Sequence, residues 1–414
     1  MRFLAGLLCA MLCAVPASSQ VATGIDVLEQ QSFSPLKLMA QRHGGQLRLG
    51  ILTNPVGIDA HERRTIDILR EDAAAAIPGL KVVKLFSAEH GIDAAVDHSN
   101  IESTTDPASG LPIISLFGAS EAQRHPTSEQ LAGLDAVVID LQDVGVRYWT
   151  FQTLVEYFLE ASAQNKIEVV VLDRPNPIGG AAVQGPISTK GRENYVNPYA
   201  EPMRPGMTMG ELAGFFNGER HLGAQLTVVK MIGWHRQDWY DETGLLWINP
   251  SPNIRSLTQA MTYPGIGLLE GTNVNVKGPT GEPFVRFGAP WISATQLAAY
   301  LNARKVLGAS FMAVSYTPGG EERYPYRGER SEGVEVIVTD RNLLDAPELG
   351  IEVASALWKL YPEKFQVDKV DRLLLNHEVL DAIKRGVDPR TIASSWKSEL
   401  DGFKARRLHY LLYQ

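Results

Sequence analysis

Short apolar runs rich in β-branched residues recur through the first two thirds of the chain, and segments with amphipathic helical spacing lie between them. Strands are expected at 47–52, 81–86, 112–116, 135–141, 167–172 and 225–231. Helices are expected at 62–76, 150–165 and 208–220. Fully apolar strands that alternate with helices are typical of a parallel sheet covered on both faces. The pattern therefore predicts the α/β class.

The pattern changes near residue 255. Residues 262–291 are rich in Gly, Pro and Asn and are expected to form a long loop, which is usually functional at such a length. The rest predicts a smaller α+β domain, with strands near 311–317 and 333–339 and helices at 294–306, 347–361, 376–386 and 389–411. The expected division is a targeting segment at 1–19, a catalytic domain at 20–258 and an ancillary domain at 259–414.

The first nineteen residues have the order of a secretory signal peptide. Arg2 is followed by an apolar run from Phe3 to Val15 and then by small residues. The run is shorter than the roughly 20 residues of a membrane span, so no stable membrane insertion is expected. The expected location is secreted or periplasmic, and the alternative is an uncleaved N-terminal anchor. Cys9 and Cys13 both lie in this segment, so the mature chain has no disulfide, no thiol nucleophile and no Cys-ligated zinc.

Composition and charge narrow the class of function. The chain carries 39 Lys+Arg against 47 Asp+Glu, a formal charge of −8. This balance argues against nucleic-acid binding, which usually needs a basic domain or stripe. The sequence contains no GxSxG, HExxH or P-loop lysine motif, so we expect no cofactor and no metal.

Polar residues directly follow most of the expected strands. The carboxyl ends of parallel strands share one edge of a sheet, where ligands bind, so these side chains are expected to line one crevice. For Asn54-Pro55 the alternative is an ordinary turn. The residues concerned are Asn54, Glu89, His90, Gln142, Asp143, Asp173, Arg174 and Asn176.

Two carboxylates are the strongest catalytic candidates. Glu89 follows a strand, and Glu270 lies in the Gly-rich segment. Glycoside hydrolysis needs one protonated carboxyl for the leaving oxygen and a second group as base, nucleophile or orienting residue. For Glu89 the alternative is a helix cap or a surface acid. Asp143 and Asp173 are further candidates, with structural ion pairs to nearby arginines as the alternative.

With these residues in view, the chain resembles a bacterial family of exo-β-N-acetylmuramidases, long described as a domain of unknown function. The resemblance runs in order from about residue 24 to the C-terminal end. Its carriers include Thr53-Asn54-Pro55, Glu89-His90-Gly91, Gln142-Asp143-Val144-Gly145-Val146-Arg147-Tyr148, Asp173-Arg174-Pro175-Asn176-Pro177, Gly206-Met207-Thr208, Pro250-Ser251-Pro252-Asn253 and Glu270-Gly271-Thr272-Asn273.

The resemblance implies a Rossmann-like N-terminal domain that carries the site. It also implies release of N-acetylmuramic acid from the non-reducing end of peptidoglycan fragments, with Glu89 as a catalytic residue and Glu270 as the second. The 2-acetamido group of the sugar is an alternative internal nucleophile. The expected partners are muramic acid saccharides, whose lactyl carboxylate suits Arg147 or Arg174. The expected substrate-binding residues are Asn54, His90, Gln142, Asp143, Arg147, Tyr148, Asp173, Arg174, Asn176, Asn253 and Asn273.

The chain departs from the family pattern in three places. Ala88 stands where the family usually has Pro, and Pro205 stands where it usually has His. After Asn273 the family typically has Ser-Glu-Gly-Arg-Gly-Thr, whereas this chain has a different run from Val274 to Thr280. Two alternatives therefore stay open: a non-catalytic periplasmic binder of peptidoglycan fragments, and an esterase or amidase that acts on the same polymer.

Overall fold

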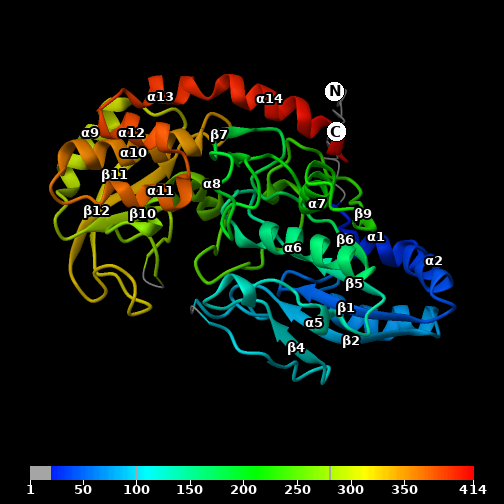
Figure 1. Ribbon diagram of the computed structural model, residues 1–414. Helices are drawn as coiled ribbons and strands as arrows, with labels where there is room; N and C mark the ends of the chain where they lie inside the picture. The colour runs from blue at the N-terminus through cyan, green and yellow to red at the C-terminus, as the bar shows by residue number, and fades with distance from the viewer. Residues whose placement is uncertain (1–19, 98–99, 279–280) are drawn as a thin grey trace, which may run out of the picture.

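The structure is a computed structural model that describes residues 20–97, 100–278 and 281–414. The expected signal segment at 1–19 lies outside these residues. The chain forms a large α/β part and a smaller second part, which lie at the lower right and the upper left of Figure 1. None of the helices in the described ranges is long and apolar enough to cross a membrane.

The α/β part is built on a seven-stranded sheet in the order β3-β4-β2-β1-β5-β6-β9. All neighbours pair in parallel except β3 and β4. Without the short edge strand β3, the six strands follow the doubly wound order 3-2-1-4-5-6 of Rossmann folds. The predicted Rossmann-like α/β class is thus confirmed. The strands are β1 Leu47–Thr53, β2 Leu80–Ser87, β3 Thr104–Thr105, β4 Pro112–Ser115, β5 Ala136–Asp140, β6 Glu168–Leu172 and β9 Leu226–Val229.

Helices cover both faces of this sheet because alternate strand residues point to opposite faces. Val137 and Ile139 of β5 belong to the core shared with α6 (Thr150–Asn165) and α7 (Met209–Glu219). Ala136 and Val138 belong to the opposite core. That core is closed by helices α1 (Gly24–Gln30) and α2 (Ser34–Arg42) and by one continuous helical segment. The segment consists of α3 (Thr65–Ile68), a π-helix at Leu69–Ala73 and α4 (Ala74–Ala76). A short α5 (Ser128–Leu131) precedes β5.

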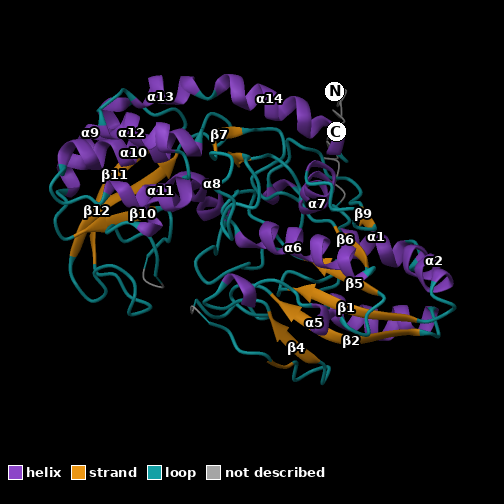
Figure 2. Ribbon diagram, viewed as in Figure 1, coloured by secondary structure: helices purple, strands orange, loops and turns teal. Residues whose placement is uncertain are grey.

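The second part has a separate antiparallel sheet in the order β10-β12-β11, which Figure 2 shows among its helices. A small β7–β8 ribbon (Gln184–Ile187 and Pro202–Arg204) belongs to the segment between β6 and α7. The remaining elements are α8 Leu257–Ile266, β10 Arg286–Ala289, α9 Ala294–Arg304, β11 Ala309–Tyr316, β12 Ser331–Val338, α10 Ala346–Leu360, α11 Asp371–Leu374, α12 His377–Lys384, α13 Pro389–Ser395 and α14 Lys397–Arg407.

The chain ends by returning to the first part. Helix α14 runs back across the top of Figure 1 toward α7, and the C-terminus lies there. The hydroxyl of Tyr413 donates a hydrogen bond of 2.6 Å to Asp173 at the end of β6. The final helix was expected as one element at 389–411, but it breaks at Trp396.

The expectation of a long loop at 262–291 was wrong over its first third and again at β10, which covers Arg286–Ala289. Helix α8 continues to Ile266, and a 3-10 turn covers Gly267–Gly271. Gly265 permits this because α8 crosses α10 closely, so a Cβ at Gly265 would lie 2.1 Å from the carbonyl oxygen of Ala346. Pro264 falls in the last turn, where the Tyr148 hydroxyl donates to the carbonyls of Tyr263 and Pro264 at 2.9 and 2.7 Å. Tertiary contacts thus stabilise a helix that Gly and Pro argue against locally.

Candidate active site

A cavity of about 600 Å³ opens beside the end of β2 and the start of α6, against the second part of the chain. This is a typical size for a small-ligand site. Its lining mixes charged and aromatic side chains from the two parts. These are mainly Glu89, His90, Asp97, Phe117, Glu121, Arg124, Tyr148, Trp149, Thr150, Tyr195, Asn253, Tyr263, Glu270, Lys277, Phe284, Arg323 and Arg372.

Glu89 enters the cavity from the tight turn that follows β2. His90 and Gly91 have φ angles of 75° and 82°, so the chain takes two consecutive left-handed residues. A non-glycine residue in this region is uncommon and is often found at functional sites. Thr150, the first residue of α6, donates a hydrogen bond of 2.7 Å from Oγ1 to Oε2 of Glu89. The half-buried carboxyl is thereby held at the cavity wall.

Asp97 is a buried carboxylate that organises one side of the cavity. It accepts hydrogen bonds from the Tyr324 hydroxyl and, at 3.1 Å, from Nδ2 of Asn253. Arg323 lies 2.9 Å away. Burial raises the pKa of Asp97, but Lys277, the Tyr324 hydroxyl and Arg323 outweigh it and hold that pKa below its ordinary value. Asp97 therefore stays ionised at neutral pH.

Lys277 joins two carboxylates across the cavity wall. Its ammonium forms an ion pair with Glu270 and lies 3.7 Å from Asp97. Burial lowers the pKa of Lys277, but these two carboxylates overcome this and raise it above the ordinary lysine value. Lys277 is therefore a cation at neutral pH, and Glu270 is held beside a fixed positive charge. The side chain of Glu270 remains 30% exposed, so it can still meet a ligand.

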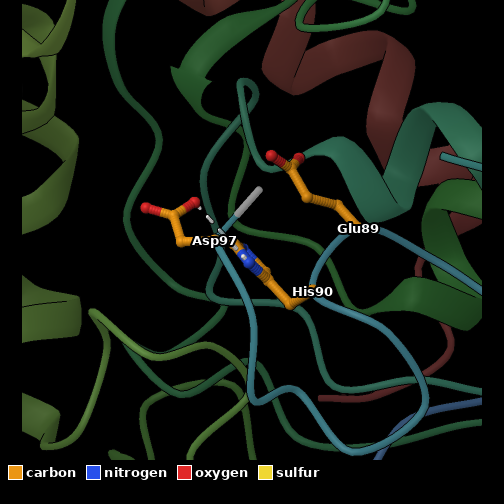
Figure 3. A group of neighbouring side chains, drawn as sticks. All are labelled: Glu89, His90 and Asp97. Carbon is orange, nitrogen blue, oxygen red and sulfur yellow. Dashed lines mark ion pairs between the residues drawn. The ribbon is translucent and has the colours of Figure 1, made fainter. Parts of the chain in front are cut away.

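Figure 3 shows the group formed by Glu89, His90 and Asp97, with a dashed line for the ion pair of His90 with Asp97 at 3.9 Å. These three side chains offer ligand atoms within 4.8 Å of one another, which is the spacing of a possible cation site. The oxygens of Asp97 already contact Arg323 and Lys277, however, and Nδ1 of His90 lies 2.9 Å from the carbonyl oxygen of Val96. This donor set fits an ion-paired polar wall better than a metal centre.

The structure brings some of the sequence-predicted residues together and not others. Glu89, His90, Tyr148, Asn253 and Glu270 line the cavity. The expectation that all strand-end residues share one crevice was wrong for the others, because their polar groups bond within the protein. Outside the cavity lining are Asn54, Gln142, Asp143, Arg147, Asp173, Arg174, Asn176 and Asn273.

The two predicted anion-binding arginines are the main correction. Arg147 is fully buried, and its guanidinium donates to four backbone carbonyls, including those of Leu373 and Leu374 in α11 at 2.6 and 2.9 Å. Arg174 is 5% exposed and forms a two-pronged pair with Asp140, at 2.5 and 2.9 Å. Asp140 ends β5 beside β1, at the switch point where Rossmann folds bind dinucleotides, and the pair is buried there.

The remaining displaced residues are also used internally. Asp173 accepts hydrogen bonds from Thr208 and Tyr413, and Asn176 donates to the carbonyl of Met207 at 2.9 Å. The others hold local backbone: Gln142 donates to the carbonyls of Asp143 and Pro175, Asn54 accepts from the Val56 amide, and Asn273 donates to the carbonyl of Lys364.

Asp143 is buried, and it supplies a pH-dependent prediction. Burial raises its pKa to about 7, although nearby backbone N–H groups such as that of Gly145 oppose the shift. The folded state therefore binds this proton more tightly than the unfolded chain, whose Asp pKa is about 3.9. The stability that Asp143 contributes is full below about pH 4 and is lost as the pH rises through about 7.

In urea denaturation, wild-type stability relative to Asp143→Asn should therefore fall between pH 5 and pH 8. Asp381→Asn, which changes an exposed carboxyl on α12, is the control. The raised pKa of Asp143 would be contradicted if the free energy of unfolding of the wild type minus that of Asp143→Asn were the same at pH 5 and pH 8.

Sequence reasoning missed several cavity residues. Asp97, Glu121, Arg124, Lys277, Arg323 and Arg372 are the charged ones, and Thr150 holds Glu89. The sequence did offer a signal for Lys277, because this residue lies in the segment from Val274 to Thr280 that departs from the family pattern. Arg323 and Arg372 lie far along the chain in the second part and had none.

Two carboxylates that face one cavity are the arrangement of glycoside hydrolases, here on a Rossmann-like domain that supplies Glu89 while the second part supplies Glu270. The chain belongs to the family "Exo-beta-N-acetylmuramidase NamZ". The N-terminal domain of that family matches residues 49–258, and its C-terminal domain matches residues 261–413. The resemblance found in the sequence is confirmed.

Three individual proteins are similar to this chain over nearly its whole length. The peptidoglycan β-N-acetylmuramidase NamZ of Bacillus subtilis (strain 168) is 36% identical over 398 residues, which are 95% of this chain and 92% of that protein. Two crystal structures of DUF1343 family proteins from Bacteroides fragilis NCTC 9343 are similar. One has a TM-score of 0.84 at 33% identity, covering 95% of this chain and 99% of that one; the other has a TM-score of 0.75 at 27% identity, covering 96% and 99%.

Proposed function

We propose that this protein is an exo-acting glycoside hydrolase that releases N-acetylmuramic acid from the non-reducing end of peptidoglycan fragments. The observation that carries this proposal is the cavity that Glu89 and Glu270 share, in a chain of the exo-β-N-acetylmuramidase family. The B. subtilis relative is a peptidoglycan β-N-acetylmuramidase, and the coverage of both chains supports the same chemistry here.

Glu89 is the general acid of the proposed reaction. Its carboxyl protonates the glycosidic oxygen while the bond from that oxygen to C1 of the sugar breaks. Water adds to C1, so the products are the free sugar and the shortened saccharide. The hydrogen bond from Thr150 holds Oε2 of Glu89, and the side chain lines the cavity.

Glu270 is the anionic partner in this proposal. The ion pair with Lys277 fixes the position of its carboxylate. A carboxylate there can act as a base for water, orient the 2-acetamido group of the sugar, or stabilise the positive charge that develops at C1. Lys277 stands where this chain departs from the usual family pattern, and it supplies a cation of its own to this wall.

The proposed place of action is outside the cytoplasm, in the periplasm or the medium. The charged start, the apolar run of thirteen residues from Phe3 to Val15 and the small residues after it support export by a cleaved signal peptide. Mass measurement of the protein recovered from the periplasm of an expressing cell tests this: cleavage near residue 19 is expected, and an intact N-terminus would contradict it.

The activity is tested with the purified mature protein and the disaccharide N-acetylmuramic acid–β-1,4–N-acetylglucosamine. Mass spectrometry of the products should find the two free sugars. An intact disaccharide that nevertheless binds saturably would replace this proposal with a binding protein. Release of an acyl group or a peptide from larger fragments, without free sugar, would replace it with an esterase or amidase.

A further inference from the structure

The cations of the cavity differ in whether a carboxylate already neutralises them. Lys277 is paired with Glu270 and lies near Asp97, and Arg323 is paired with Asp97 at 2.9 Å. Arg124 lies 3.8 Å from Glu121, and its guanidinium covers the ring of Tyr195 at 4.3 Å. These three cations are therefore partly satisfied by the protein itself.

Arg372 is the exception. It lines the cavity, and its side chain is exposed. Within residues 20–97, 100–278 and 281–414, no carboxylate oxygen lies within 4.0 Å of its guanidinium. A guanidinium without a protein partner, at the wall of a cavity that holds several carboxylates, is free to bind a ligand anion in two-pronged geometry.

The backbone that carries Arg372 is fixed on both sides. Asp371 is paired with Arg192 at 2.9 Å, and the carbonyl of Leu373 accepts a hydrogen bond of 2.6 Å from the buried Arg147. The side chain of Arg372 then passes over Gly271, where an added Cβ would lie 3.0 Å from its Cδ. Gly271 follows Glu270, so a fixed stretch of backbone carries the Arg372 side chain past the second catalytic candidate.

From this charge balance we infer that Arg372 is a specificity-determining residue that binds the free lactyl carboxylate of the muramic acid ring. The inference rests on the proposed function and adds to it the group that distinguishes muramic acid from N-acetylglucosamine, which has the same ring without the lactyl acid. Arg147, which the sequence suggested for this role, acts instead as the buried support of the α11 backbone.

The test measures inhibition of disaccharide hydrolysis by N-acetylmuramic acid and by its lactyl carboxamide, which has the same size but no charge and one carboxylate oxygen replaced by NH2. Wild-type enzyme should bind the acid about 10-fold more tightly, which corresponds to about 1.4 kcal/mol, because hydrogen bonds to a charged group are stronger than those to a neutral one. In Arg372→Gln the acid should inhibit no better than the amide. Arg372→Lys should keep part of the preference, because it keeps the charge and loses the two-pronged geometry.

Arg385→Gln is the matched control, since Arg385 is an exposed arginine of the same part of the chain and does not line the cavity. It should keep the wild-type preference. If Arg372→Gln also keeps it, Arg372 does not bind the lactyl carboxylate and the inference is overturned. If the wild-type enzyme does not hydrolyse the disaccharide at all, the proposed function fails, whereas direct calorimetric binding of the acid and amide to both proteins still decides the role of Arg372.

Discussion

Glu89→Gln is expected to abolish most of the hydrolytic activity while leaving the fold intact. Loss of a general acid typically lowers the rate by about 10²–10⁴-fold. Glutamine keeps the size of the side chain and can still accept the hydrogen bond from Thr150, so the turn after β2 should not change. The effect should therefore fall on kcat, with little change in KM or in the denaturation midpoint.

The measurement is kcat and KM for the disaccharide, with Glu102→Gln as the control because Glu102 is an exposed carboxyl on the segment between β2 and β4. A second substrate separates the roles further. A β-N-acetylmuramide with a nitrophenolate leaving group needs little protonation, so Glu89→Gln should be far less impaired on it. Equal impairment on both substrates would contradict the general-acid role, and unchanged kcat on the disaccharide would remove Glu89 from the catalytic step.

Arg174→Met is expected to give the largest loss of stability among the residues discussed. The mutation leaves Asp140 as a buried carboxylate without its ionic partner, and removal of one member of a buried pair typically costs about 3–5 kcal/mol. It also removes a donor to the carbonyl of Ile58, at 2.9 Å. We expect a clear fall in the midpoint of urea denaturation.

Two variants make this result interpretable. Arg48→Met breaks an equally well-formed pair with Asp135 on the surface and should change the midpoint little, because surface pairs contribute little. The double variant Arg174→Met with Asp140→Leu should recover much of the loss, since an apolar pair avoids the unpaired charge. If Arg174→Met instead kept its stability and raised KM for the disaccharide, the arginine would bind substrate as the sequence suggested.

The core of the fold could be predicted from local sequence, and the reason is physical. The central strands β5 and β6 are nearly continuous apolar runs because helices cover both faces of the sheet, and such runs stand out from the helical spacing between them. Segments with mixed signals were harder to predict. Helix α8 contains Pro264 and Gly265, and it is stabilised by packing against α10 and by the Tyr148 hydroxyl, neither of which is near it in sequence.

The candidate site was predictable only in part. Glu89 was predicted because a turn after a strand does not by itself need Glu and His, so these residues indicated a function. The Glu-His-Gly motif also matches the family pattern. Arg147 and Arg174 looked equally suitable, since sequence position gives no measure of burial. Both are buried and bonded to protein groups, Arg147 to backbone carbonyls and Arg174 to Asp140. Arg372 had no sequence signal, and among the described residues that line the cavity it is the cation without a carboxylate partner.

By itself, the sequence determined the succession of strands and helices along the α/β part, the family and the turn that carries Glu89. These features depend on short-range spacing and on motifs that follow one another in the same order along the chain. Only the tertiary structure decided which polar side chains face the ligand and which bond within the protein. That choice depends on groups far apart in the chain, such as Asp97 with Lys277 and Arg147 with Leu373, meeting across the interface between the two parts. A buried charged group is costly unless it is paired or hydrogen-bonded, and its partner often lies far away in the sequence. Its role therefore depends on burial and pairing and not on its neighbours in sequence.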